Sequence, residues 1–238
     1  MTPKRAMVLA AGYGKRMRPL SATTPKPLIS VAGKALLDHC LDGLAACGVE
    51  TAIVNVHYLA DLVEAHLRRR QTPHIIVSDE RAELLDTGGG IAGALPHLGE
   101  QPFFLRNSDS FWLEGVRPNL QWLADGWDDD RMDALLLLAA TVDSAGYAGH
   151  GDFNLAKDGR LSRRVERTVA PFVYAGAAIL HPRLFTDAPD GAFSLNLQFD
   201  RAIDEQRLFG VRLDGQWINV ESPDAITIAE TAIAESAA

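Results

Sequence analysis

The sequence predicts an α/β fold in which helices cover both faces of a mostly parallel, mixed sheet, giving three layers. Two observations predict it. The first half of the 238 residues alternates short apolar or β-branched runs with amphipathic segments of helical period, an order typical of parallel sheets. After Asp133 the pattern changes to several strand-like segments with few helices, which predicts a small β-rich lobe joined to the same domain.

The elements of the first half are expected at its periodic segments. Apolar runs of four to eight residues indicate strands, and apolar residues three or four apart indicate helices. In chain order these are strand 5–11, helix 35–47, strand 51–56, helix 59–70, strand 74–78, helix 90–98 and strand 102–105. Because parallel sheets bind ligands at the carboxyl ends of their strands, polar residues that follow these strands are site candidates.

The second half is expected to contribute mainly strands. The continuous apolar run 134–142 predicts a buried strand, and segment 152–165 has two strand-like arms around the turn Lys157-Asp158-Gly159. The remaining expected elements are strand 172–180, helix 195–205, a strand-rich segment 208–220 and helix 223–236, which has a proline in its first turn. No linker or repeat divides the chain, so we expect a single domain over residues 1–238.

Composition and charge exclude several partners. A formal net charge of −8 offers no basic surplus for nucleic acid or an anionic membrane. The longest apolar run, Ala134 to Val142, is too short to span a bilayer, and no signal peptide is evident, so we expect a cytoplasmic protein. Cys40 and Cys47 are expected to stay reduced and to pack in the interior. The chain is expected to be a monomer or a small homo-oligomer.

The segment from Val8 to Leu28, VLAAGYGKRMRPLSATTPKPL, predicts a phosphate-binding site. An apolar strand leads into the turn Gly12-Tyr13-Gly14, where the lack of Cβ atoms lets backbone N–H groups approach a ligand. Two cations follow, Arg16 and Lys26, and prolines on both sides of Lys26 stiffen its backbone. This segment is not a dinucleotide-binding fingerprint, because Met17 stands where a third glycine is needed, and no Gly-Lys-Ser/Thr completes a Walker A loop.

The same segment resembles the signature of the sugar-1-phosphate nucleotidylyltransferases, L-A-A-G-x-G-x-R-x-x-P-L followed by P-K-P-L. The resemblance implies a Rossmann-like nucleotidyltransferase fold and transfer of a nucleoside monophosphate to a sugar 1-phosphate, with release of pyrophosphate. It implies a nucleotide-binding half over about residues 1–132 and a sugar-binding half over about 133–238. It further assigns catalysis to Arg16 and Lys26 and nucleotide binding to these two residues with Ala11, Gly12 and Gly14.

The resemblance also implies a Mg²⁺ site. In the family, one metal ligand is an aspartate in a strand-end G-D or N-G-D motif, which Asn107-Ser108-Asp109 matches with serine in place of glycine. The second ligand lies in a W-x-D-x-G-[TS]-P segment, here Trp217 to Pro223, in which Asn219 replaces the aspartate and Glu221 the glycine. Because an amide oxygen can still bind Mg²⁺, we expect Asp109 and Asn219 to be the ligands.

The segment around Thr87 and Gly88 resembles the family's L-G-T-[AG]-G, whose backbone borders the nucleobase. Alone it would be a helix-capping turn. A backbone that reads a base edge suits a pyrimidine, and uracil is the expected base. Either Glu80 or Arg81 falls near a position that contacts the base, without a fixed register.

Four residues are expected to bind the sugar: Asn107, Gly151, Glu166 and Gly176. Glu166 resembles the glutamate of a V-E-K-P motif, with Arg167 in place of the lysine that binds the sugar phosphate. Gly176 belongs to a V-N-T-G-like segment in which Tyr174 replaces asparagine, and Tyr174 could either close or line the pocket. The alternative for Gly151, Glu166 and Gly176 is an ordinary exposed turn or strand residue.

Among subfamilies, the chain looks most like bacterial N-acetylmuramate-1-phosphate uridylyltransferases of cell-wall recycling, because of its compact length and its L-D-T-G-G-G, N-S-D and G-D-F elements. This resemblance implies UTP and N-acetylmuramate 1-phosphate as substrates. Two alternatives stay open: a glucose- or mannose-1-phosphate nucleotidylyltransferase, and a nucleotide-sugar sensor without turnover. The histidines show no zinc-ligand spacing, and no G-x-S-x-G motif indicates a serine hydrolase.

Overall fold

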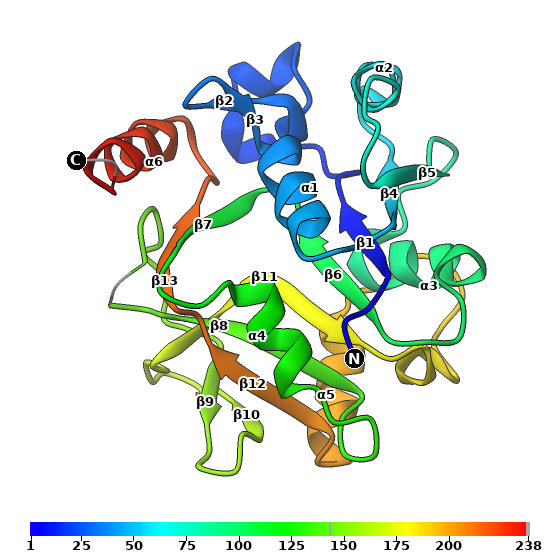
Figure 1. Ribbon diagram of the computed structural model, residues 1–238, viewed down its shortest axis with the longest axis vertical. Helices are drawn as coiled ribbons and strands as arrows, with labels where there is room; N and C mark the ends of the chain where they lie inside the picture. Colours follow the sequence, from blue (N-terminus) through cyan, green and yellow to red (C-terminus); the bar gives the residue numbers. More distant parts are fainter. Residues whose placement is uncertain (143, 237–238) are drawn as a thin grey trace.

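The computed structural model describes residues 1–142 and 144–236, which are organised around a nine-stranded sheet (Figure 1). Its strands are β1 (Arg5–Leu9), β4 (Thr51–Val56), β5 (His74–Asp79), β6 (Phe103–Asn107), β8 (Ala134–Ala140), β9 (Phe153–Leu155), β10 (Leu161–Arg163), β11 (Phe172–Leu180) and β12 (Leu208–Arg212). The main path has the order β10-β9-β11-β6-β1-β4-β5, and β8 joins it through β11 and carries β12 on its other side.

The sheet is parallel in its first half and mixed in its second. β6, β1, β4 and β5 are mutually parallel, whereas β11 runs antiparallel to both β6 and β8. β12 is parallel to β8, and a bulge interrupts the register of β11 between Tyr174 and Ala178. Both halves of the chain therefore share one sheet, and their junction is the β6–β11 pair.

Helices cover both faces of this sheet. The helices α1 (Leu36–Ala46), α2 (Ala60–Leu67) and α4 (Asn119–Gly126) contribute to one apolar cluster, and α3 (Asp86–Leu98) and α5 (Asn196–Asp204) to another. Alternate residues of β1 supply the two clusters, Ala6 and Val8 on one side and Met7 on the other, as the period of a strand requires. The three-layer α/β architecture expected from the sequence is confirmed.

A smaller unit lies beside the sheet. The strands β7 (Ser110–Glu114) and β13 (Gly215–Asn219) pair antiparallel, and α6 (Pro223–Ser236) follows β13. This unit packs through a third apolar cluster, to which the hairpin of β2 (Ser30–Val31) and β3 (Lys34–Ala35) also contributes. The expected strand-rich segment 208–220 thus divides into two strands that belong to different sheets.

Some boundaries differ from the sequence-based expectation. The helix expected over 90–98 begins four residues earlier, at Asp86, so Thr87 and Gly88 lie in its first turn. Glycines lower helix propensity, but here they permit close packing: a Cβ on Gly89 would lie 2.2 Å from the carbonyl oxygen of Gly191. β8 ends at Ala140 rather than Val142, which is exposed. β7 and α4 were not expected from the pattern.

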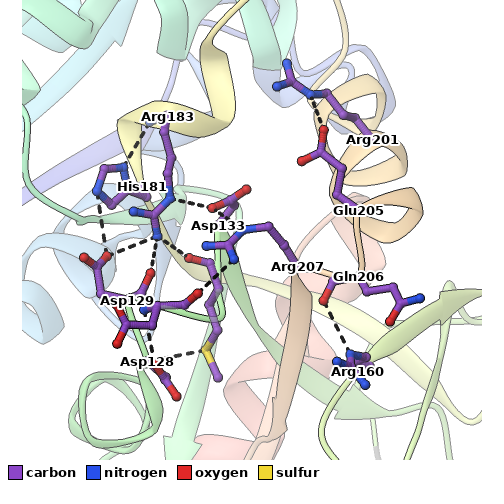
Figure 2. Close-up of polar contacts among 12 residues, drawn as sticks. Asp128, Asp129, Asp133, Arg160, His181, Arg183, Arg201, Glu205, Gln206 and Arg207 are labelled. Carbon is purple, nitrogen blue, oxygen red and sulfur yellow. Dashed lines mark hydrogen bonds and ion pairs between the residues drawn. The ribbon is translucent and has the colours of Figure 1, made fainter.

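Charged side chains join the strands at the sheet end where β6 begins (Figure 2). Asp133, directly before β8, binds Arg183 Nε at 2.6 Å and Arg207 Nε at 2.9 Å. Arg183 lies in a 3₁₀ turn (Pro182–Phe185) after β11, and Arg207 precedes β12. One buried carboxylate therefore connects the ends of three strands. None of the helices in the described residues is both long enough and apolar enough to cross a bilayer.

Candidate active site

A cleft of about 330 Å³ opens at the carboxyl ends of β1, β4 and β6. The predicted site residues that line it are Ala11, Gly12, Gly14, Arg16, Lys26, Thr87, Asn107 and Asp109. Those that do not line it are Gly88, Gly151, Glu166, Gly176 and Asn219. The structure thus brings together the residues of the opening segment and the end of β6, which are far apart in the sequence.

The glycine turn is held in place while its backbone donors stay open. The N–H of Ala10 donates to Asn55 Oδ1 at 2.7 Å, which fixes the start of the turn. Gly14 has φ of 61°, and a Cβ there would lie 2.9 Å from Lys26 Cβ, so only glycine fits. The N–H groups of Ala11, Gly12 and Gly14 have no acceptor among the described residues. Such open amides beside a turn can bind an anion.

Lys26 connects the opening segment to the end of β6. Lys26 lies between Pro25 and Pro27 and begins a one-turn 3₁₀ helix (Lys26–Leu28). Its side chain is 13% exposed. Its Nζ lies 2.9 Å from Asp109 Oδ2, and the Asp109 side chain is 33% exposed. A cation and a carboxylate therefore meet at the cleft with one carboxylate oxygen still accessible to a further partner.

The contacts of Ser108 show what a serine does at the end of β6, where the family pattern has glycine. Its Oγ donates to the carbonyl oxygen of Leu9 at 2.7 Å, and its N–H donates to the same oxygen at 3.2 Å. These bonds tie the carboxyl ends of β1 and β6 to one another. The serine hydroxyl is turned into this contact, and Ser108 is buried.

Arg16 is held across the cleft by an acidic residue near the C-terminus. Its two terminal nitrogens contact both carboxylate oxygens of Glu221, and the Nη2–Oε1 distance is 3.0 Å. The arginine side chain is 70% exposed and the glutamate 34%. Glu221 stands where the family pattern has glycine. This bidentate ion pair therefore arises at a position where the chain departs from that pattern.

Asn219 lies next to Asp109 in the fold but outside the cleft lining. It ends β13, pairs in register with Ser110 of β7, and is buried. The following residue, Val220, donates its N–H to the carbonyl oxygen of Asp109 at 3.1 Å. The backbone therefore places Asn219 beside the expected metal ligand, and Glu221 is the residue of this segment that reaches the cleft.

Thr87 and Gly88 join the cleft to the loop before α5. Thr87 lines the cleft, and its Oγ1 accepts the N–H of Leu195 at 2.9 Å. The N–H of Gly88 donates to the carbonyl oxygen of Phe193 at 2.8 Å, and a Cβ on Gly88 would lie 2.4 Å from the Phe193 ring. Gly88 is therefore required for packing, and its amide is already engaged.

Asn55 is a residue of the cleft that the sequence patterns missed. It lies in the otherwise apolar strand β4, where a buried polar side chain signals a required hydrogen bond. Besides fixing Ala10, it donates from Nδ2 to Glu80 Oε1 at 2.7 Å. Glu80 is buried and its other oxygen accepts the N–H of Leu85, so it supports the wall of the cleft without lining it. Arg81 instead joins exposed carboxylates, including Asp61.

The expected sugar-binding residues are divided between two places. Asn107 lines the cleft, and Gly176 packs directly behind it: a Cβ on Gly176 would lie 3.1 Å from Asn107 Cβ. Gly151 donates its N–H to Tyr147 Oη at 3.0 Å, in the loop between β8 and β9. The Glu166 side chain is almost fully exposed, and its carboxylate pairs with Arg167 at 3.8 Å. The structure does not bring Gly151 and Glu166 to the cleft.

Tyr174 neither closes nor lines the cleft. Its ring packs edge-on against Phe199 of α5 with ring centroids 5.8 Å apart, and its Oη is buried without a partner among the described residues. Burial raises the pKa of the Tyr174 hydroxyl above its ordinary value. The tyrosine is therefore a neutral core side chain beneath the bulge of β11.

Comparisons with known proteins identify the family. The model of the MobA-like NTP transferase domain matches residues 6–137. The chain is 49% identical to the N-acetylmuramate alpha-1-phosphate uridylyltransferase of Caulobacter vibrioides, over 98% of both chains. It is 33% identical to the protein of the same name from Neisseria meningitidis serogroup B, over 91% of this chain and 92% of the relative.

The fold agrees with this relationship. The crystal structure of HddC from Yersinia pseudotuberculosis, complexed with GMP-PN, superposes with a TM-score of 0.76 over 96% of this chain and 99% of that one, at 21% identity. The sequence signature, the cleft at the strand ends and these relatives agree. The chain belongs to the MobA-like NTP transferase family and is a sugar-1-phosphate nucleotidylyltransferase.

Proposed function

We propose that the enzyme transfers UMP from UTP to N-acetylmuramate 1-phosphate. The observation that carries this proposal is one cleft in which open backbone amides, Arg16, Lys26 and Asp109 converge. The choice of UTP and of this sugar is supported by the names of the near full-length relatives from Caulobacter vibrioides and Neisseria meningitidis. A cytoplasmic location and a role in cell-wall recycling are parts of the same proposal.

The reaction requires two anionic phosphates to approach one another. A phosphate oxygen of the sugar 1-phosphate attacks the α-phosphorus of UTP, a new P–O bond forms, and the bond to the bridging α,β-oxygen breaks. Pyrophosphate leaves with that electron pair, so no enzyme-bound intermediate is needed. Charge neutralisation and alignment therefore supply most of the catalysis.

Each cleft group has a role in this mechanism. The open amides of Gly12 and Gly14, with Arg16, would bind the β- and γ-phosphates that depart. Both terminal nitrogens of Arg16 contact Glu221, so the glutamate and the triphosphate would compete for this guanidinium. Lys26 would neutralise charge that develops at the α-phosphate. Because Lys26 is packed on Gly14 and paired with Asp109, its ammonium is held in place before the substrate arrives.

The residues present fit a Mg²⁺ ion bound largely through the substrate. The described residues contain no group of three His, Cys, Asp or Glu side chains that could hold a metal. Mg²⁺ needs no such cage, since it commonly binds one or two carboxylates together with substrate phosphates. Asp109, whose side chain is partly exposed at the cleft, would hold the ion, which when bound supplies neutralising charge to the phosphates. Asn219 lies beside Asp109 in the fold but does not line the cleft, so its role as the second ligand stays a prediction from the sequence.

The test is pyrophosphate release by the purified enzyme. UTP is combined with N-acetylmuramate, glucose and mannose 1-phosphates, and each sugar is also tested with the other nucleoside triphosphates. We expect the highest kcat/KM for UTP with N-acetylmuramate 1-phosphate, and loss of turnover with EDTA that MgCl₂ restores. A preference for another pair would replace the substrate assignment, and no release with any pair would contradict catalysis.

A further inference from the structure

A second cavity, of about 570 Å³, lies between α1, β7 and α4 and shares no lining residue with the cleft. Its walls are largely apolar and include Cys40, Phe111, Trp112 and Leu120. The ring of His39 stacks on Phe111 with centroids 4.4 Å apart. A concave apolar site with few polar groups is the usual form of a small-molecule site.

One charged side chain from the sheet reaches this cavity. Arg106, in β6, is 2% exposed and is part of the cavity wall. Its guanidinium carbon lies 4.0 Å from the centroid of the Trp112 ring, and Nη2 donates to the carbonyl oxygen of Ser110 at 3.1 Å. The bond from Nη1 to the Gly176 carbonyl oxygen is long, at 3.4 Å, and Nε has no acceptor among the described residues.

No ion pair in the described part of the chain includes Arg106, and the buried Cys40 thiol, whose pKa burial raises, is its other side-chain neighbour besides Trp112. The carboxylates that line the cavity are engaged elsewhere. Asp42 pairs with Lys34 and Arg70, and Glu114 accepts hydrogen bonds from Trp112 and Asn119. A buried cation without an anionic partner is unfavourable, and its incompletely satisfied donors require an explanation.

We propose that this cavity binds a small organic monocarboxylate, whose carboxylate contacts Arg106 and whose aromatic or aliphatic body fills the apolar space. One guanidinium matches one carboxylate in geometry and charge. A polyphosphate would need several cations, and the other cation of the wall, Lys34, is already paired with Asp42. The apolar walls favour a ligand body without charge.

The probes are phenylacetate and hexanoate, each compared with its neutral amide by calorimetry and by thermal shift. We expect carboxylate binding with a Kd on the order of 1 mM, as befits ligands of this size, and a higher Tm because the ligand binds the folded state. The amides should bind at least about ten-fold more weakly, since one charge-assisted contact is lost. Failure of both carboxylates to bind, or equal binding of the amides, would overturn the proposal.

Two kinds of variant test whether the carboxylate binds in this cavity. Arg106→Met should weaken carboxylate binding at least about ten-fold by removing the cation. Because that variant alters a buried site, Gly43→Leu provides a second test: Gly43 lies in α1 at the cavity, and a Cβ there would meet only Leu120, at 3.9 Å. Leucine would fill the space and favours the helix. Gly43→Ala is the matched control and should bind as wild type does. Unchanged binding in Gly43→Leu would contradict the location.

Discussion

At the carboxyl ends of β1 and β6, Arg16 and Lys26 each contact one carboxylate, whereas at the opposite end of the sheet Arg183 and Arg207 share the buried Asp133. The contacts of the two ends also differ in kind. Arg183 additionally donates to the backbone carbonyl of Met132 at 2.7 Å, while the amides around Gly12 stay open. The end with Asp133 joins strands, and the end with the cleft is the one where we propose that a phosphate binds.

The comparison shows that charge alone does not identify a site. Both ends contain arginines and aspartates, but in the described part of the chain Arg16, Lys26 and Asp109 line a cleft beside open backbone donors, whereas Asp133, Arg183 and Arg207 line none. A cation whose contacts a ligand can replace is suited to binding, and a cation that completes a buried network is suited to stability. Substitutions at the two ends should therefore change different quantities, and the four that follow run from the largest expected effect to the smallest.

The largest effect is expected for Lys26→Ala. Turnover should fall by about 10²-fold or more, because one preorganised electrostatic group is removed. Alanine keeps the Cβ that packs on Gly14, so the Tm should change little. Pyrophosphate release and thermal unfolding are measured together, with Lys4→Ala as a control that removes an exposed cation. Near-normal turnover would refute the role of Lys26.

At the opposite end, Asp133→Asn should lower the free energy of unfolding by about 2 kcal/mol, since two partly exposed arginines lose a shared, buried carboxylate. Turnover per folded molecule should not change. Urea unfolding gives the stability, and Asp130→Asn is the control, because it removes the same charge from an exposed residue of the same turn. A loss of turnover without a loss of stability would show that the two ends are not separate in function.

Glu221→Gln should lower the KM for UTP by about two- to five-fold, the scale of one exposed ion pair. The glutamate and the triphosphate compete for Arg16, and the neutral amide competes less. Steady-state kinetics at low ionic strength measure the effect, with Glu235→Gln on α6 as control. If KM rises or kcat falls, Glu221 supports the bound state instead of opposing it.

The smallest effect concerns pH. Burial, followed by the charge of Arg183, lowers the pKa of His181, and its Nδ1 accepts the N–H of Arg183 at 3.0 Å. Folding therefore favours neutral His181, so its contribution is full above the unfolded pKa, about 6.5, and is lost as the pH falls below it. Between pH 8 and pH 5.5 the Tm of the wild type should fall slightly more than that of His181→Asn. His150→Asn, an exposed histidine, should behave as wild type.

The sequence patterns predicted the parallel half of the sheet well, because each strand and helix there has a complete apolar period of its own. They missed β7 and α4, which are short and gain their stability from packing against β13 and the sheet. They also placed the start of α3 too late, since three consecutive glycines oppose a helix locally. The close packing of Gly88 and Gly89 on the Gly191–Phe193 loop, and of Gly90 on Glu80 and Asn55, explains them.

The residues of the candidate site also fall into two groups, those that sequence patterns predicted and those that they missed. The glycine turn at Gly12, the cations Arg16 and Lys26, and Asp109 after β6 were predictable, because short motifs at strand ends contain these residues. Asn55 and the Arg16–Glu221 pair were not, since a buried asparagine in a strand and a contact across 205 residues of sequence leave no local pattern. The sugar-binding assignments rested on weaker motifs, and Gly151 and Glu166 lie outside the cleft.

By itself, the sequence determined the fold class and the family, and it predicted the segment that lines the cleft, because local periodicity and a dense motif are properties of neighbouring residues. Only the tertiary structure decided which charges meet. Lys26 with Asp109, Arg16 with Glu221, and Arg106 outside any ion pair of the described residues are all consequences of strand order and packing. Electrostatic interactions depend on distance and burial in space, and the order of residues along the chain does not encode either directly.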